Sequence, residues 1–188
     1  MNFEKDIQSC LHVLKNGGLI LYPTDTVWGI GCDATNVLAV EKIFRLKNRP
    51  DAKALIVLVA EERDVLQYAA AADLQVFDFL QQQKKPTTVV YEGAIGLADN
   101  LVAKDSSVAI RICQDIFCKH LLKRFRKPIV STSANISGQI PPSNFAGISD
   151  EIKNGVDYVV NHRQDETSAA MPSAVIKWSN GRVTIIRE

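Results

Sequence analysis

Alternating helical and strand patterns along most of the chain constrain its fold more than any other feature. Apolar residues recur at helical spacing in residues 7–14, 37–44 and 116–125, and twice within residues 61–83. Short apolar or β-branched runs separate and follow these segments, at residues 19–22, 54–59, 87–91, 108–112 and 129–130. Such interleaving is typical of an α/β domain, in which helices flank a sheet.

Strand patterns dominate after residue 155. Asn180 and Gly181 tolerate positive φ and predict a hairpin between residues 174–176 and 183–186. An antiparallel hairpin joined to interleaved helices and strands predicts an open, twisted, mixed sheet with flanking helices. We expect residues 1–188 to form one domain, because a chain of this length buries roughly 70% of its unfolded surface without disulfide or metal support.

Composition narrows the classes of function. The 22 basic and 21 acidic residues give a net charge of +1, so the overall charge of the protein does not favour binding of nucleic acid. No apolar run reaches the ~18 residues of a membrane span, and the acidic N-terminus lacks the pattern of a signal peptide. We therefore expect a cytoplasmic protein without membrane contact.

The cysteines predict buried, reduced thiols, because the four residues are scattered and no C-x-x-C pair is present. Cys113, Cys118 and His120 match no standard zinc spacing. We therefore identify no protein side chains as metal ligands.

A first polar cluster occupies residues 22–31, where a buried strand gives way to P-T-D-T-V-W-G-I-G. Thr24, Asp25 and Thr26 offer short hydrogen-bonding groups at a strand end, where open α/β sheets tend to bind ligands. The segment fits a ligand loop and, equally well, a turn before a bulged strand.

The second cluster, residues 47–53, holds three cations in K-N-R-P-D-A-K. Pro50 favours an extended Arg49, which would place the Lys47 and Arg49 side chains on one side, suited to a polyphosphate. The alternative is that these cations bind no ligand and only interact favourably with the C-terminus of the preceding helix.

The third cluster, S-T-S-A-N-I-S-G at residues 131–138, concentrates hydroxyls and an amide directly after a strand. Such groups need partners when buried, so the segment indicates either a ligand site or a capping turn closed by Gly138. Arg111, between Ile110 and Ile112 on an expected strand, needs a carboxylate, which either the protein or a substrate could supply.

No Walker A loop, dinucleotide-binding glycine pattern or Ser-His-Asp arrangement accompanies these clusters. The three histidines, His12, His120 and His162, share no obvious site. The pattern favours an electrostatic site in which cations and hydroxyls position a phosphate transfer.

Taken together, the order P-T-D-T-x-x-G-I-G, K-N-R-P-x-x-K-x-L and S-T-S-A-N-x-S-G closely resembles the YrdC-like (TsaC) family of L-threonylcarbamoyladenylate synthases. The resemblance implies a basic concave cavity on the sheet. It also implies that L-threonine, bicarbonate and ATP, accompanied by Mg²⁺, give threonylcarbamoyl-AMP and pyrophosphate. This is the first step of threonylcarbamoyladenosine (t6A) modification of tRNA, so tRNA and downstream threonylcarbamoyl-transfer proteins are implied partners.

The resemblance also implies roles for single residues. Lys47 and Arg49 would be catalytic and would hold the triphosphate, and the other ATP contacts would be Lys53, Ser107, Asn135, Ser143 and Arg187. The threonine contacts would be Thr26, Arg111, Ser133 and Ser173, with Arg111 pairing with the carboxylate.

Three departures from the family pattern stand out. Lys84, Lys85 and Pro86 replace an aromatic-Pro-Gly-Pro segment, and residues 161–171 lack a glycine pair and suggest a polar flap. The sequence stops at Glu188, as in the short, single-domain bacterial members. The alternative function is a paralogue of the same fold that binds double-stranded RNA or tRNA without this activity.

Overall fold

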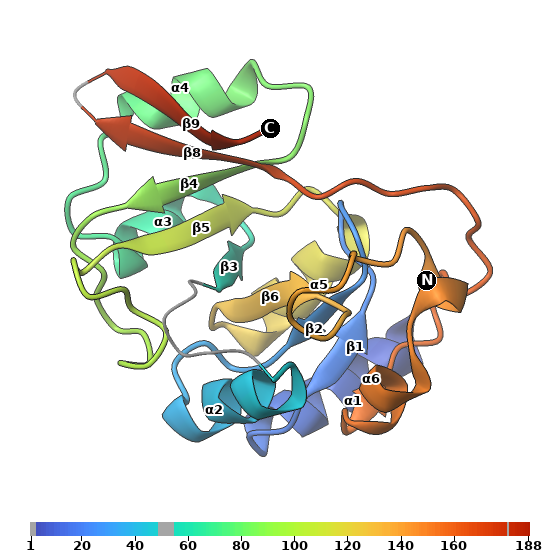
Figure 1. Ribbon diagram of the computed structural model, residues 1–188. Coiled ribbons are helices and arrows are strands. Elements are labelled where there is room, and N and C mark those ends of the chain that lie inside the picture. Colours follow the sequence, from blue (N-terminus) through green and yellow to red (C-terminus); the bar gives the residue numbers. More distant parts are fainter. Residues whose placement is uncertain (1–2, 49–54, 180) are drawn as a thin grey trace.

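The computed structural model describes residues 3–48, 55–179 and 181–188. Within these residues the strands form one mixed sheet of order β7-β1-β2-β6-β3-β5-β4-β8-β9 (Figure 1). The strands are β1 (Ile20–Tyr22), β2 (Gly29–Gly31), β3 (Ile56–Val59), β4 (Thr87–Tyr91), β5 (Val108–Ile112), β6 (Ile129–Ser133), β7 (Tyr158–Val159), β8 (Ala174–Ser179) and β9 (Arg182–Arg187). The predicted α/β class and mixed sheet are confirmed.

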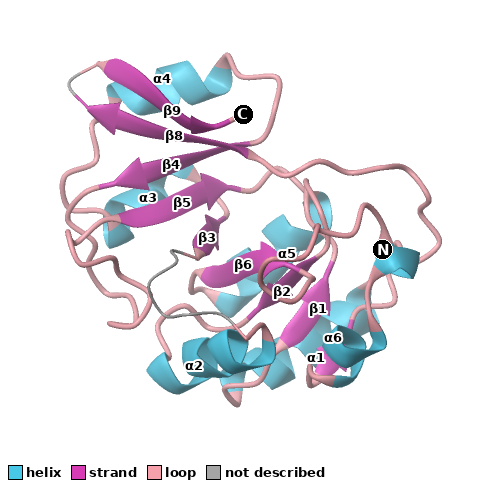
Figure 2. Ribbon diagram, in the orientation of Figure 1, coloured by secondary structure: helices cyan, strands magenta, loops and turns pink. Residues whose placement is uncertain are grey.

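Most helices cover one face of this sheet. The helices are α1 (Glu4–Lys15), α2 (Val37–Leu46), α3 (Glu62–Tyr68), α4 (Gln75–Gln81), α5 (Ile116–Phe125) and α6 (Asp150–Asn154). Figure 2 shows α1 and α5 behind β1, β2 and β6, and α3 and α4 behind the strands at the other end. The sheet therefore buries one face under helices and leaves much of the other to loops.

Side-chain caps fix where two of these helices begin. The Asn36 side chain accepts a hydrogen bond from the backbone N–H of Ala39 at 3.1 Å and caps α2. The Asp115 carboxylate accepts one from the N–H of Cys118 at 2.8 Å and caps α5. The inner faces of α1 and α5 are buried, and all four cysteines are buried free thiols.

Some elements were not predicted from the sequence. β2 is two glycines around Ile30, β7 has two residues, and α6 and a 3-10 turn (Phe145–Gly147) are short. Elements of this length show little periodicity in the sequence. Whether the residues of β2 and β7 form strands is decided by their pairing with neighbouring strands. The β8–β9 hairpin is present with Gly181 at φ +72°, whereas Asn180 lies outside the described residues.

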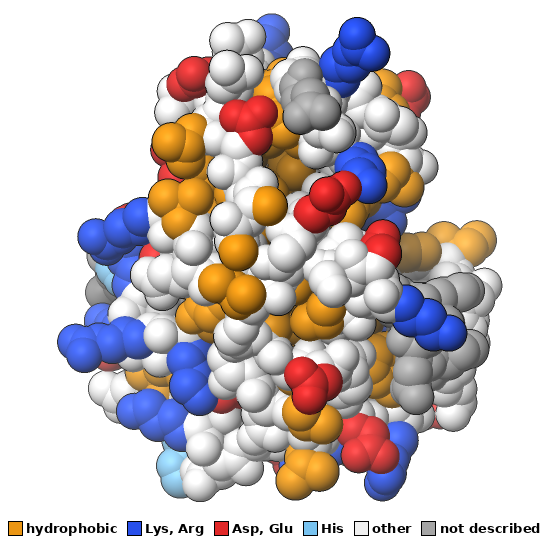
Figure 3. Space-filling model, turned by 90° about the vertical axis from the view of Figure 1, so that its left-hand side faces the viewer, with side chains coloured by type: hydrophobic (Ala, Val, Ile, Leu, Met, Phe, Trp, Pro, Cys, Tyr) orange, Lys and Arg blue, Asp and Glu red, His pale blue; other side chains and the backbone are white. Residues whose placement is uncertain are grey.

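Charged and hydrophobic side chains are mixed on the molecular face shown in Figure 3. Lysine and arginine lie along the left edge of that face and also at its top and right side, and hydrophobic side chains are distributed across its middle. Among the described residues, no helix has the length and apolar character needed to cross a membrane.

Gly31 is required by the close packing of β1 against β2. A Cβ at this position would lie 2.6 Å from the Tyr22 ring and 2.8 Å from the Val130 carbonyl oxygen. Because Tyr22 is buried, we expect Gly31→Ala to lower the free energy of unfolding by about 1–3 kcal/mol. Urea denaturation measures this, with Gly147→Ala as the control, since Gly147 has no positive φ and a Cβ there would come no nearer than 3.4 Å to its neighbours. Equal losses in the two variants would contradict the packing argument.

Candidate active site

A cavity of about 360 Å³ lies on the sheet face opposite the core helices. Val57 and Ile110 are buried among core residues, so their neighbours Ile56 and Ala109 point to the other face. Ser131, Ile56, Ala109 and Val90 are cross-strand partners in one row over β6, β3, β5 and β4, and all line the cavity. Its polar lining residues are Thr26, Arg111, Ser131, Thr132, Ser133, Ser173 and Arg187.

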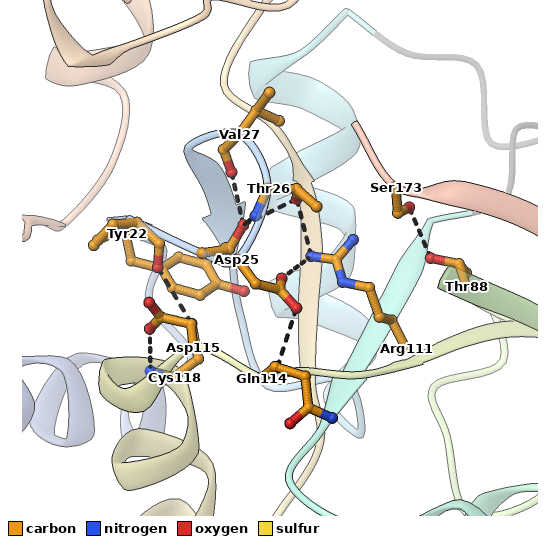
Figure 4. Close-up of polar contacts among 12 residues, drawn as sticks. Tyr22, Asp25, Thr26, Val27, Thr88, Arg111, Gln114, Asp115, Cys118 and Ser173 are labelled. Atoms are coloured by element: carbon orange, nitrogen blue, oxygen red, sulfur yellow. Dashed lines mark hydrogen bonds and ion pairs between the residues drawn. The ribbon is translucent and has the colours of Figure 1, made fainter. Parts of the chain in front are cut away.

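Arg111 is the buried cation of this cavity. Its side chain is 3% exposed, and Nη2 lies 3.1 Å from the Asp25 carboxylate oxygen Oδ1 (Figure 4). Asp25 Oδ1 has no hydrogen-bond partner, so its contact with Arg111 is an ion pair without hydrogen-bond alignment. Arg111 Nε also has no hydrogen-bond partner. The other Asp25 oxygen accepts the backbone N–H of Gln114 at 3.1 Å. The protein therefore holds Arg111 with a carboxylate but leaves hydrogen-bonding capacity for a ligand.

Thr26 presents its hydroxyl to Arg111 through a chain of hydrogen bonds. Arg111 Nη2 donates to Thr26 Oγ1 at 3.2 Å, and Thr26 Oγ1 lies 3.1 Å from Thr24 Oγ1. Thr24 Oγ1 accepts the N–H of Thr26 and donates to the Val27 carbonyl at 2.8 Å. These bonds fix the loop after β1 as a turn that leads into β2, as the turn interpretation of residues 22–31 describes, and the ligand-loop interpretation stays a prediction.

Ser173 and Arg187 form another wall of the cavity. Ser173 Oγ lies 2.9 Å from Thr88 Oγ1 on β4, and Arg187 donates from Nη2 to the Ser173 carbonyl at 2.9 Å. Burial of the Arg187 guanidinium and the nearby positive charge of Arg111 lower the pKa of Arg187. Two arginines facing one cavity give it a local preference for anions, which the near-neutral net charge conceals.

Lys47 takes a different position from the one expected of a triphosphate ligand. Its side chain is 1% exposed, and Nζ donates to the backbone carbonyls of Ser133 and Asn135. The Lys47 carbonyl in turn accepts the N–H of Ser137 at 2.8 Å. In this structure Lys47 therefore holds together the turn after β6 that carries the third polar cluster.

Asn135 closes the same turn. Its Nδ2 donates to the carbonyls of Ile136 and Gln139, both at 2.9 Å, which fixes the direction of the amide. Its Oδ1 is a buried acceptor without a hydrogen-bond partner. A buried polar atom left without a partner is typical of a ligand site, so this oxygen suits a donor on a bound molecule.

The structure brings together five of the predicted site residues: the cavity is lined by Thr26, Arg111, Ser133, Ser173 and Arg187. Four others lie outside its lining: Lys47, as described above, and three more. Ser107 shares the face of Arg111 on the approach to β5 but donates to Asp105, Asn135 lies beyond Ser133, and Ser143 lines a smaller neighbouring cavity with Thr26. Arg49 and Lys53 lie outside the described residues.

Sequence reasoning missed two residues of the site. Asp25 was recognised as a polar loop residue but not as the partner of Arg111, and Thr88 was assigned only to a strand. The requirement of a buried strand arginine for a carboxylate was the available signal for Asp25. Nothing in the alternation of β4 distinguished Thr88 from a core threonine.

A larger cavity of about 440 Å³ lies elsewhere, between α3 and α5. Three of the four cations that line it contact carboxylates: Lys123 and Arg63 contact Glu61, and Lys127 contacts the buried Asp33 at 2.7 Å. The cavity with Arg111 is the better candidate, because it combines a buried cation with polar atoms that lack hydrogen-bond partners.

Comparisons with known proteins agree with this fold. The chain is 30% identical over 181 residues to threonylcarbamoyl-AMP synthase of Idiomarina loihiensis (95% of this chain, 96% of the relative). It is 36% identical over 140 residues to that of Photobacterium profundum (73% and 75%).

Solved structures show the same fold at lower identity. P. abyssi Sua5 complexed with L-threonine superposes with a TM-score of 0.86 at 22% identity over 98% of this chain, which spans 54% of the Sua5 chain. E. coli YciO superposes with a TM-score of 0.84 at 22% identity over 98% of this chain and 89% of YciO. A sequence model of the Sua5, YciO and YrdC proteins, described as "Telomere recombination", matches residues 12–188. The chain therefore belongs to the Sua5/YciO/YrdC family.

Proposed function

We propose that this protein is a threonylcarbamoyl-AMP synthase, which converts L-threonine, bicarbonate and ATP to threonylcarbamoyl-AMP and pyrophosphate. The observation that carries the proposal is the buried Arg111, which is held between Asp25 and Thr26 and lines the cavity. Its relatives of near-full-length coverage carry this name.

The amino acid would bind with its carboxylate against Arg111. The guanidinium provides charge-assisted hydrogen bonds, and the Thr26 hydroxyl, already aligned by Thr24, provides a further polar contact. Ser133 and Ser173 lie in the same cavity and would complete the polar contacts of threonine. The apolar lining residues Ile56, Val90 and Val175 leave room for the substrate methyl group.

The reaction asks little covalent chemistry of the protein. The threonine amine takes up bicarbonate to form a carbamate and water, and a carbamate oxygen then attacks the α-phosphorus of ATP while pyrophosphate leaves. Alignment of the carbamate with the phosphorus and neutralisation of the negative charge of the leaving group would supply most of the acceleration. The local positive charge of Arg111 and Arg187 suits this task.

The ATP contacts remain predictions. Arg187 lines the cavity, Asn135 offers an unpaired acceptor, and Ser143 lines the small cavity beside it. Ser107, directly before β5, lies on the face that carries Arg111. Arg49 and Lys53 would approach the phosphates, and the buried Lys47 would add positive charge beneath them. Among the described residues, no group of three or more His, Cys, Asp or Glu is placed to hold a metal ion. Mg²⁺ would reach the cavity on the ATP phosphates, and the donors that line it suit the negatively charged complex.

A role in tRNA modification, with a cytoplasmic location and transfer proteins that accept the adenylate, belongs to the same proposal. RNA binding without synthase activity is the alternative. It predicts a mobility shift of RNA with steep salt dependence, because phosphate contacts release counterions.

One assay tests the proposal. Purified protein is incubated with ATP, Mg²⁺, bicarbonate and threonine, and the products are followed by mass and by pyrophosphate release. We expect threonylcarbamoyl-AMP only when all components are present, and less product when serine replaces threonine, because one methyl group is worth about 1–3 kcal/mol. ATP consumption that does not depend on threonine would overturn the assignment.

A further inference from the structure

We propose that Arg163 is a positioning residue for the amino-acid end of the cavity: it holds the Thr24–Thr26 loop from behind, and threonine affinity depends on it. This inference rests on the proposed function. Arg163 belongs to the segment 161–171 that the sequence suggested as a flap, and its hydrogen-bond partners among the described residues, Thr24, Asp115 and Glu166, do not line the substrate cavity.

The Arg163 guanidinium joins three segments. Its Nη1 donates to the Thr24 carbonyl at 3.2 Å and to the Asp115 carboxylate oxygen Oδ2 at 2.8 Å. Its Nε donates to the Glu166 carboxylate at 2.8 Å. The side chain is 27% exposed, so these contacts are partly shielded from water. Asp115 uses its other oxygen to cap α5, so the guanidinium is tied to a rigid helix start.

The contact with Thr24 reaches the substrate side through two residues. The Thr24 carbonyl faces Arg163, while the Thr24 hydroxyl orients Thr26, whose own hydroxyl accepts from Arg111. Thr26 lines the cavity of about 360 Å³ that contains Arg111. It also lines a cavity of about 30 Å³ that Arg163 and Glu166 line from the other side. The loop is thus one layer thick between Arg163 and the proposed threonine site.

The segment that carries Arg163 is itself anchored. Asp6, 5% exposed on α1, accepts hydrogen bonds from the Tyr158 hydroxyl at 2.6 Å, the Asn161 N–H at 3.1 Å and the His162 N–H at 2.9 Å. Burial alone would raise the Asp6 pKa, but these donors outweigh it and lower the pKa. Arg163 adopts φ +69°, an uncommon conformation for a side-chain-bearing residue, which this anchoring maintains.

The arrangement predicts an effect on one substrate. Without Arg163 the Thr24 carbonyl loses a charge-assisted partner and the loop gains freedom, so Thr26 and Arg111 are less well placed for the amino acid. Residues expected to contact ATP, such as Arg187 and Asn135, have no described contact with Arg163. A general loss of stability would instead weaken the binding of both threonine and ATP.

Two variants test this in the full chain. Arg163→Ala removes the guanidinium, and Asp115→Asn removes its charged partner but keeps a side chain that caps helices equally well. The matched control is Arg124→Ala, which breaks an ion pair of an arginine on α5 with Glu4 at 2.5 Å, away from the loop. Steady-state kinetics gives the KM for threonine and for ATP, and hydrogen exchange followed by mass spectrometry reports on the peptide of residues 22–28.

We expect the KM for threonine to rise about tenfold in Arg163→Ala and severalfold in Asp115→Asn, with the KM for ATP and the melting temperature nearly unchanged. We also expect faster amide exchange in residues 22–28 of both variants, and neither change in Arg124→Ala. Unchanged exchange in this peptide, or equal rises in both KM values, would overturn the positioning role. If the wild-type protein forms no threonylcarbamoyl-AMP, the proposed function fails, whereas the exchange result still decides whether Arg163 holds the loop.

Discussion

Arg111→Met should lower kcat/KM for threonine by about 10²–10³-fold, because truncating one partner of a buried charge pair costs about 2–5 kcal/mol and each 1.4 kcal/mol is tenfold. Arg111 is 3% exposed and packed against Asp25 and Thr26, so a cation from solvent cannot take the place of its guanidinium in the variant. Threonine-dependent pyrophosphate release at saturating ATP measures the loss.

The same variant should also be less stable, by about 3–5 kcal/mol in urea denaturation, because the carboxylate of Asp25 stays buried without its cation. The double variant Asp25→Asn with Arg111→Met removes that unpaired charge. We expect it to recover most of the stability and none of the activity. Recovery of activity in the double variant, or full activity in Arg111→Met, would show that the guanidinium does not bind the amino acid.

Long, regular elements could be predicted from the sequence because each carries its own signal. The apolar stripe of α1, the Asn36 cap of α2 and the β-branched run of β4 all mark their elements locally. β7 and the bounds of β2 could not be predicted, because their two or three residues become strands only by pairing with neighbouring strands. The pairings of β7 with β1 and of β2 with β6 join parts of the chain more than a hundred residues apart, which no local pattern encodes.

The candidate site was predictable in part for a similar reason. Two segments of unusual polarity after strands gave Thr26 and Ser133, the position of an arginine within an expected strand gave Arg111, and the sheet order brings these residues together. Which groups pair across the cavity, such as Thr88 with Ser173, depends on strand register and not on residue type. The polar flap suggested for residues 161–171 is also refined, since hydrogen bonds to Asp6, Thr24 and Asp115 anchor its beginning.

Lys47→Met should remove activity and also destabilise the protein by about 2–5 kcal/mol. A lysine that only grips a polyphosphate would leave stability unchanged when replaced, because its head group would face solvent in the absence of ATP. Here Nζ is buried and donates to the carbonyls of Ser133 and Asn135, and an unsatisfied buried carbonyl costs about 1–3 kcal/mol. Urea denaturation without ATP and threonine-dependent turnover measure the two effects on the same preparation.

Arg45→Met is the matched control, since Arg45 lies near the end of α2, is 77% exposed and pairs only with the exposed Glu41 in the described contacts. Exposed pairs of this kind contribute about 0–1 kcal/mol, so the control should keep its stability and its turnover. If Lys47→Met is as stable as the control but inactive, Lys47 acts on the nucleotide alone, and its contacts with the turn after β6 are incidental. If it is destabilised and inactive, one buried ammonium both shapes the turn that presents Ser133 and Asn135 and provides positive charge beneath the proposed nucleotide site.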